Sequence, residues 1–411
     1  MKPRVMIISA VIPAVDRGGG CLALHRHFIE RDDFDFAVAS MYPLGEAEFS
    51  QFPIQRFSIS AFFRFFQCFR LAENVNYFLA EALLPRGLLT FVREWAPTVI
   101  FSVVDDFHTP IAMRIARRLN IPLVVNFQDL FACSRFLADW RRPYNWLTPR
   151  LLSRYRNTQS VAEGVLHTSL GMKRWFGAQA RGEILYPIGG EGGRSRGPHV
   201  FSGARRRLVY AGNCYGPYGE MILQLAERLE NHPGWDLEVY AMGNDWPEES
   251  VAHFAGKGTY RGYLPFLELR LRLENADVLL AAMSFHSGDR TFMETSFTTK
   301  IIDYLSLARP IVVWAPAYST AAHFAVTTRA AILVGESDAG KVVESLEQFA
   351  LGSPSSHELM VAASDAAEGV FHMNHIHKIL KTTIQSVIGT MNTEDEGPGP
   401  DPVPPLFGPR T

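Results

Sequence analysis

The chain has few cysteines and no excess of basic residues. Its four cysteines, Cys21, Cys68, Cys133 and Cys214, lie far apart among 411 residues, and no C-x-x-C or metal-ligand spacing joins them. Reduced thiols in the cytoplasm are the simplest interpretation, and we expect no metal site. Forty basic residues against 42 acidic ones leave a formal charge of −2. Nucleic-acid-binding proteins usually have an excess of basic residues, which this chain lacks, so we expect no nucleic-acid partner.

Long hydrophobic runs are also missing. No stretch approaches the roughly 18 unbroken apolar residues that a membrane-spanning helix requires. The apolar run from Val5 to Val15 does follow Lys2, as in a signal peptide. That run is rich in β-branched residues, contains Pro13 and lacks a small-x-small cleavage site, which favours a buried first strand instead. We expect a cytoplasmic protein that meets a membrane only from the side, at its inner face.

Short apolar segments alternate with helical patterns along most of the chain. Six strand-like segments precede residue 190 and six follow it, among them "RVMIISAVI", "TVIFSVV", "RLVYAG" and "ADVLLAAM". Such alternation is typical of parallel sheets buried on both faces and built from right-handed βαβ units. Because the length also favours two domains, the pattern predicts an α/β protein with two Rossmann-like halves.

Composition marks the boundaries of these halves. The predicted units are a first domain over 1–187, a linker over 188–207, a second domain over 208–365, a crossover helix over 366–390 and a disordered tail over 391–411. The linker is rich in Gly, Arg and Ser, and the tail is rich in proline with almost nothing to bury. On the crossover helix, His372, His375 and His377 are expected at the surface, since no acidic or cysteine partner is evident.

Three consecutive glycines, Gly18, Gly19 and Gly20, separate the first strand from a helix that is expected to begin near Leu22. Glycines let the backbone approach a ligand closely, and a helix N-terminus offers free N–H groups to an anion or a polar sugar. The spacing is not G-x-G-x-x-G, so a plain tight turn is an equally good interpretation. We expect these glycines to border a ligand site.

A second glycine-rich loop, "YAGNCYGPYGE", follows the first strand of the second half. It places Gly212 and Asn213 at a carboxyl strand end, where open α/β sheets bind ligands. A glycine-rich turn without a ligand is the alternative.

A hydroxyl-rich loop precedes the segment "TTKIIDYLSLARPIVV". Thr298 or Thr299 can cap the helix that starts there, and Lys300 and Asp303, three residues apart, share one face. Such a helix start presents N–H groups to a diphosphate, to which Lys300 adds positive charge, while a carboxylate one turn later can accept hydrogen bonds from two ribose hydroxyls. The alternative is an ordinary amphipathic helix with a surface ion pair that contributes about 0.2 to 0.5 kcal/mol.

The stretch "SFTTKIIDYLSLARPIVV", together with "YAGNCYG" and "GTYRGYLPFLELRLRLENADVLLAAMSF", resembles the nucleotide-binding half of GT-B-fold glycosyltransferases, especially the retaining family 4 type. The resemblance implies GT-B architecture, in which two Rossmann-like domains face each other across a cleft and a C-terminal helix packs back on the first. It also implies a nucleotide-sugar donor, UDP- or GDP-linked, as substrate, with no cofactor required.

Several positions depart from the family's pattern. Thr295 stands where the first glutamate of the E-x7-E motif is expected, and the neighbouring Glu294 is kept as a sugar contact. The second acid is Asp303 rather than glutamate. Ala308 replaces a glycine, which would cost about 1 kcal/mol if φ is positive there. Tyr218 stands where a lysine is expected.

Polar side chains follow two predicted strands of the first half. "VVDDFH" supplies Asp106 and His108, and "NFQDLF" supplies Asp129, in the region where members of the resembled family place a histidine or an aspartate. Carboxylates and imidazole near a reacting sugar can orient hydroxyls or accept the acceptor's proton. His108 and Asp129 are therefore predicted to be catalytic. The acceptor side is expected to comprise Asp106 and the glycines Gly18, Gly19 and Gly20. The alternative is that these loop acids cap helices.

Residues 57–71, "FSISAFFRFFQCFRL", are unusually aromatic. On a helix, this pattern suits peripheral contact with a bilayer surface or an acceptor groove for a lipid. A helix packed under its own domain is the alternative.

These features predict a glycosyltransferase of hexosyltransferase type. It would move a sugar from a nucleotide-sugar donor to a glycan or lipid-linked acceptor, in polysaccharide or glycoconjugate synthesis. Two alternatives stay open: a nucleotide-sugar epimerase on the same fold, and a non-catalytic GT-B-like subunit that binds a glycan or a partner enzyme.

Overall fold

The protein was analysed as a computed structural model. It describes residues 2–15, 17–41, 52–58, 70–130, 148–190, 205–352 and 354–394. Most of the aromatic segment 57–71, most of the predicted linker and residues 395–411 lie outside these ranges.

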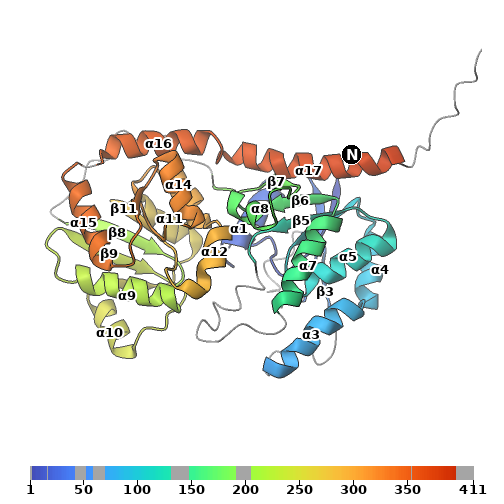
Figure 1. The fold of residues 1–411 in the computed structure, drawn as a ribbon, viewed down its shortest axis with the longest axis horizontal. Helices are drawn as coiled ribbons and strands as arrows, with labels where there is room; N and C mark the ends of the chain where they lie inside the picture. The colour runs from blue at the N-terminus through green and yellow to red at the C-terminus, as the bar shows by residue number, and fades with distance from the viewer. Residues whose placement is uncertain are drawn as a thin grey trace, which may run out of the picture.

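The described residues form two parallel sheets with helices packed against them (Figure 1). The first sheet has the order β3-β2-β1-β4-β5-β6-β7. Its strands are β1 (Arg4–Ile8), β2 (Asp35–Ser40), β3 (Ile54–Arg56), β4 (Val99–Val103), β5 (Leu123–Phe127), β6 (Gly164–His167) and β7 (Glu183–Ile184). Its helices are α1 (Gly19–Phe28), α3 (Arg70–Ala82), α4 (Arg86–Trp95), α5 (His108–Leu119), α7 (Thr148–Val161) and α8 (Leu170–Trp175).

The second sheet has the order β10-β9-β8-β11-β12-β13. Its strands are β8 (Arg206–Ala211), β9 (Trp235–Tyr240), β10 (Tyr260–Gly262), β11 (Val278–Ala282), β12 (Ile311–Trp314) and β13 (Ile332–Val334). Its helices are α9 (Pro217–Leu229), α10 (Glu248–Gly256), α11 (Phe266–Glu274), α12 (Arg290–Thr295), α13 (Thr299–Ser306), α14 (Thr320–Thr328) and α15 (Ala339–Ala350).

The central strands explain why their sequences are continuous apolar runs. Every residue of β4 and of β11 is buried, because helices cover both faces of a parallel sheet. In both sheets the strand order reverses beside the first strand, between β1 and β4 and between β8 and β11. The crevices at the carboxyl ends of such strands are where open α/β sheets bind ligands. The two predicted α/β halves and their parallel sheets are confirmed.

Two helices end the described chain. α16 (Ser356–Glu368) belongs to the second half, and α17 (Met373–Glu394) runs along the first half (Figure 1). α17 packs on β5, β6 and β7 through buried apolar residues that include Ile376, Leu380 and Ile384. The predicted return of the C-terminal helix to the first domain is therefore confirmed.

Two expectations about this end of the chain were wrong. The helix continues through residues 391–394, which were assigned to the disordered tail. His377 was expected at the surface but is only 4% exposed, because it lies next to the apolar face that α17 turns toward the first domain. Its Nδ1 lies 3.1 Å from Nδ1 of His27, and its Nε2 lies 2.8 Å from a carboxylate oxygen of Asp33.

Within the part of the chain that the structure describes, none of the helices combines the length and the apolar character needed to cross a bilayer.

Candidate functional site

A cavity of about 580 Å³ opens between the two halves, at the carboxyl ends of β8, β9 and β10. Its volume lies within the range of about 300 to 1,000 Å³ that is typical of ligand sites. The first half contributes Val15, Gly18, Gly19, Leu22 and Arg26. The rest of the lining comes from the second half and is mostly apolar, with few charged groups.

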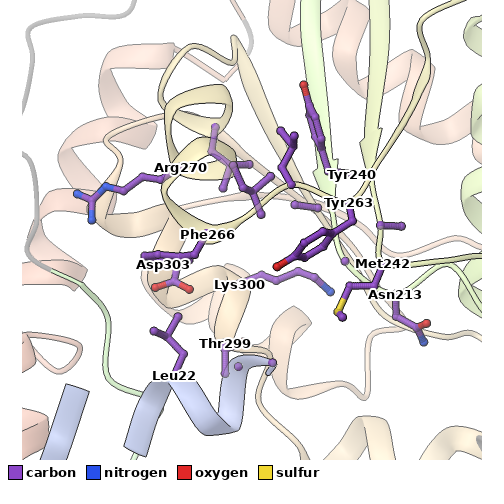
Figure 2. A pocket seen from close by; sticks show the side chains of 18 of the residues that line it. Leu22, Asn213, Tyr240, Met242, Tyr263, Phe266, Arg270, Thr299, Lys300 and Asp303 are labelled. Atoms are coloured by element: carbon purple, nitrogen blue, oxygen red, sulfur yellow. The ribbon is translucent and has the colours of Figure 1, made fainter. Parts of the chain in front are cut away.

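The start of α13 forms one wall of this cavity. Ile301, Ile302 and Leu305 are buried in the second half, so the opposite face of the helix presents Lys300 and Asp303 to the cavity. Figure 2 shows these two side chains close to Thr299, with Met242 and Tyr263 near the end of Lys300. The predicted common face of Lys300 and Asp303 is thus present.

Lys300 is a largely buried cation. Its Nζ lies 5.4 Å from the centroid of the Tyr210 ring, and among the described residues no carboxylate lies within 4.0 Å of it. Burial lowers the pKa of Lys300 to about 8. A Cβ atom at Gly212 would lie 2.2 Å from Cε of Lys300, so glycine at this position leaves room for the lysine. A buried cation that lacks an anionic partner and faces a cavity favours an anionic ligand.

Asp303 is engaged by the other half of the molecule. Nη1 of Arg26, on α1, donates to Oδ1 of Asp303 at 2.6 Å and to the carbonyl oxygen of Ile188 at 2.7 Å. Burial raises the pKa of Asp303, and the Arg26 guanidinium opposes this rise. An acid on α13 and a base on α1 therefore form an ion pair between the two halves.

The three glycines bring the first half against α13. α1 begins at Gly19, three residues earlier than expected, and Gly18 has φ of 105°. A Cβ atom at Gly19 would lie 2.2 Å from Oγ1 of Thr299. Only a residue without a side chain permits this approach. Gly18 and Gly19 line the large cavity, whereas Gly20 faces a smaller one.

This smaller cavity, of about 60 Å³, contains Asp129. Gly20 and Gln128 border it from the first half and Thr299 from the second, so Asp129 lies behind the wall of the large cavity. Burial raises the pKa of Asp129, and the nearby hydroxyl of Ser296 opposes the rise. A carboxylate with a raised pKa is better suited to accept a proton near neutral pH.

His108 lies inside the first half, away from both cavities. It is fully buried, its Nε2 accepts a hydrogen bond from the backbone N–H of Met41 at 3.0 Å, and its Nδ1 lies 3.0 Å from Asp105. Asp105 also accepts hydrogen bonds from the backbone N–H groups of Phe107 and His108, so it caps α5. The acid of this loop that binds the N–H groups at the helix start is thus Asp105 and not Asp106. Asp106 is buried too, and its carbonyl oxygen accepts from Arg154 at 3.1 Å.

Three other predicted donor residues occupy different places. Asn213 lines the large cavity, and its side-chain oxygen accepts from the N–H of Tyr215 at 3.1 Å. Thr298 is the N-cap residue of α13 but its side chain makes no capping hydrogen bond. Glu294 forms an ion pair with Arg290 at 2.8 Å and borders a separate cavity beside α8 and α14.

Several residues of the large cavity were not predicted. Arg26 and Arg270 are its additional cations, and its apolar lining includes Tyr240, Met242, Tyr263 and Phe266. For Met242 the sequence offered one indication, because this residue lies two positions after a strand of the second half. No local pattern distinguishes Arg26 from the other basic residues of α1.

Two Rossmann-like sheets, a ligand-sized cavity between the two halves at the carboxyl ends of strands of the second sheet, and a C-terminal helix that returns to the first half define the GT-B fold. The chain has this fold.

The solved structures that resemble the chain agree with this class. HepE of Anabaena, crystallised with UDP, is 12% identical with a TM-score of 0.63, over 94% of this chain and 100% of HepE. A glycosyltransferase from Rickettsia africae is 11% identical with a TM-score of 0.62, over 94% and 99%. WaaG, described as a glycosyltransferase involved in lipopolysaccharide biosynthesis, is 13% identical with a TM-score of 0.56, over 93% and 99%. No protein-family model and no curated protein sequence matches the chain.

Proposed function

We propose that this protein is a glycosyltransferase that moves a sugar from a nucleotide-sugar donor to an acceptor hydroxyl. The observation that carries the proposal is Lys300, a largely buried cation that faces a cavity of about 580 Å³ and has no carboxylate partner among the described residues. A diphosphate supplies the missing negative charge. UDP is the preferred nucleotide, because HepE, which has the same fold, was crystallised with UDP and with UDP-glucose.

The chemistry of the cavity supports one arrangement of the donor. Its diphosphate lies against Lys300, the Gly212 loop and the N-terminus of α13, where the side chain of Thr298 makes no capping hydrogen bond. Asp303, one turn further along α13, accepts hydrogen bonds from ribose hydroxyls. The base then extends toward the apolar and aromatic end of the cavity, near Tyr240 and Tyr263.

The reaction breaks the bond between the anomeric carbon of the sugar and the β-phosphate oxygen. The nucleoside diphosphate leaves with the electron pair, and the acceptor oxygen forms the new bond to the anomeric carbon. Asp129 is our candidate for the group that receives the acceptor's proton, because it lies behind Gly20 and has a raised pKa. We assign no proton transfer to His108, whose two ring nitrogens already face Met41 and Asp105. Retention of anomeric configuration is proposed from the family resemblance of residues 208–315.

A lipid-linked acceptor is the finer proposal for the first half. Val75, Phe78 and Leu83 are exposed apolar residues on or directly after α3, and the Arg150 guanidinium lies 5.0 Å from the Phe78 ring. An aromatic and basic face of this kind suits the surface of a membrane with anionic lipids. The aromatic segment 57–71 leads directly into α3. Co-sedimentation with vesicles containing anionic lipid tests this point, with vesicles of neutral lipid as the control.

The proposed function is tested by nucleotide release. Purified protein is incubated with a panel of UDP- and GDP-sugars, with and without glycan and lipid-linked acceptors. Asp303→Ala is expected to lose release, whereas Asp236→Ala, which removes an exposed carboxylate paired with Arg205, is expected to keep it. Proton NMR of the product gives the anomeric configuration.

The same assay, together with calorimetric titration of UDP and GDP, separates the alternatives. Nucleotide release that needs no acceptor would indicate an epimerase. Absence of nucleotide binding would indicate a non-catalytic subunit, which Tyr218 favours: it stands where the resembled family has a lysine, and its hydroxyl faces the sulfur of Met293 at 3.6 Å. Either outcome would contradict the proposed glycosyltransferase activity.

A further inference from the structure

Arg26 is a buried arginine of the first half that makes its contacts outside that half's core. It lies in the last turn of α1, its side chain is 5% exposed, and it still borders the large cavity. Besides Asp303 and the carbonyl oxygen of Ile188, its guanidinium lies 5.7 Å from the ring of Phe266 on α11. One side chain thus joins α1, α11, α13 and the segment that leaves the first half.

A contribution to folding stability does not by itself explain the ion pair between Arg26 and Asp303. Removing two charges from water is costly, and a buried pair often contributes little net stability compared with apolar residues of similar volume. A buried arginine needs an anionic partner, and Asp303 is the carboxylate that Arg26 contacts in the described part of the chain. The pair therefore calls for a role in the site that both residues border.

The carboxylate of Asp303 retains capacity for a ligand. An ionised carboxylate has about four lone-pair sites. Arg26 occupies one through Oδ1, and the backbone N–H of Gly190 is a further donor. Two sites remain for the two hydroxyls of a ribose. Asp303 is one methylene shorter than the glutamate of the resembled family, so its orientation matters more.

We propose that Arg26 is a positioning residue of the donor site: it holds the carboxylate of Asp303 oriented toward the ribose, so that the nucleotide site is complete only when the first half packs on α13. The inference rests on the proposed function. Arg26 acts through Asp303 and does not itself contact the nucleotide.

Loss of Arg26 has a defined chemical consequence. Burial already favours the neutral carboxyl of Asp303, and Arg26 is the strongest opposing influence. Two other groups face Asp303. Arg270 of α11 lowers the pKa of Asp303 less than Arg26 does, and Tyr304 stays protonated because burial raises its own pKa. Without Arg26, Asp303 holds its proton to higher pH, and a neutral carboxyl has less capacity to accept from two hydroxyls.

The experiment measures the Kd of UDP by calorimetry between pH 6.5 and 9 for the full chain. Arg26→Gln is expected to weaken binding about tenfold at pH 6.5. This difference from wild type is expected to narrow as the pH rises. Arg26→Lys, which keeps the charge, is expected to recover part of the loss. Arg31→Gln removes an arginine that pairs with Asn374 outside the cavity, and it serves as the control with unchanged Kd.

A double variant distinguishes positioning from direct contact. If Arg26 acts through Asp303, then Arg26→Gln/Asp303→Asn binds UDP no more weakly than Asp303→Asn alone. This double variant leaves no unpaired charge, so it also answers the question if Arg26→Gln by itself does not fold. Additive losses would overturn the inference, as would a wild-type Kd for Arg26→Gln at every pH. If the wild-type protein binds neither UDP nor GDP, the proposed function falls and this inference falls with it.

Discussion

Replacing Lys300 with methionine is expected to stabilise the protein and to weaken UDP binding at the same time. Burial lowers the pKa of this lysine from 10.5 to about 8, so the folded protein disfavours the ammonium ion. At pH 7 the lysine is nonetheless protonated in both the folded and the unfolded state. The cost of burying the charge is therefore present in the wild-type protein and absent from the variant.

The size of the stabilisation follows from the pKa. A fall from 10.5 to about 8 corresponds to about 3 kcal/mol. Because the side chain is partly exposed to the cavity, we expect about 2 kcal/mol. The sign is checked by pH. The free energy of unfolding of the wild type should rise between pH 8 and 10.5, as the folded protein loses the proton before the unfolded chain does, and Lys300→Met should lack this rise.

Binding should change in the opposite direction. A hydrogen bond to a charged group contributes about 1.5 to 3 kcal/mol, so loss of the ammonium should raise the Kd of UDP roughly 10- to 150-fold at pH 7. Above pH 8 the wild-type Kd should rise about tenfold per pH unit, because the free protein loses the proton that the diphosphate needs. The Kd of the variant should not depend on pH in this range.

Urea unfolding and calorimetry with UDP at pH 7, 8 and 9 measure both effects. Lys341→Met is the matched control, because Lys341 is an exposed lysine that pairs with Glu344 at 2.8 Å, away from the cavity. Its stability should change by less than about 0.5 kcal/mol and its Kd should equal that of the wild type. A Lys300→Met protein that is less stable than the wild type and binds UDP equally well would refute the reasoning.

Three further predictions concern particular backbone and buried positions. Gly19→Ala should weaken UDP binding, because the new Cβ would lie 2.2 Å from Oγ1 of Thr299. Gly87→Ala is the control and should leave the Kd of UDP unchanged, because no atom lies within 4 Å of the new Cβ. Equal Kd values for the two variants would contradict the proposed contact between Gly19 and Thr299. Ala308→Gly should raise the free energy of unfolding by up to about 1 kcal/mol in urea titrations, because φ is 49° there. Burial lowers the pKa of His167 to about 4, so the wild type should lose about 3 kcal/mol of stability as the pH falls from 6.5 to 4. His167→Gln should lose less over the same range, and parallel pH profiles would argue against a neutral buried ring.

The helix α13 was predicted well because its signals are local. Two threonines, a spacing of three between Lys300 and Asp303 and a proline after the helix are enough to indicate its start, its polar face and its end. The helix begins at Thr299, as expected, and ends at Ser306, before Pro310. The sequence predicts a conformational cost at Ala308 only if its φ is positive, and φ is 49° there.

The positions of other candidate site residues could not be predicted from local sequence patterns. Glu294 is adjacent in sequence to the position of the family's glutamate, but one residue on a helix changes the direction of a side chain by about 100°. It borders a different cavity and pairs with Arg290. His108 and Asp129 both follow predicted strands, yet His108 is enclosed by its own half while Asp129 approaches the second. Which of the two reaches the cleft depends on how the loops pack.

By itself, the sequence determined the two α/β halves, the parallel strands and the helix that carries Lys300 and Asp303, because hydrophobic periodicity and capping act over a few residues. The tertiary structure alone decided how the halves meet. It brings Gly19 against Thr299 and Arg26 against Asp303, 277 residues further along the chain. Such contacts depend on the docking of two separately formed cores, and no local pattern records which basic residue of α1 will face an acid of α13.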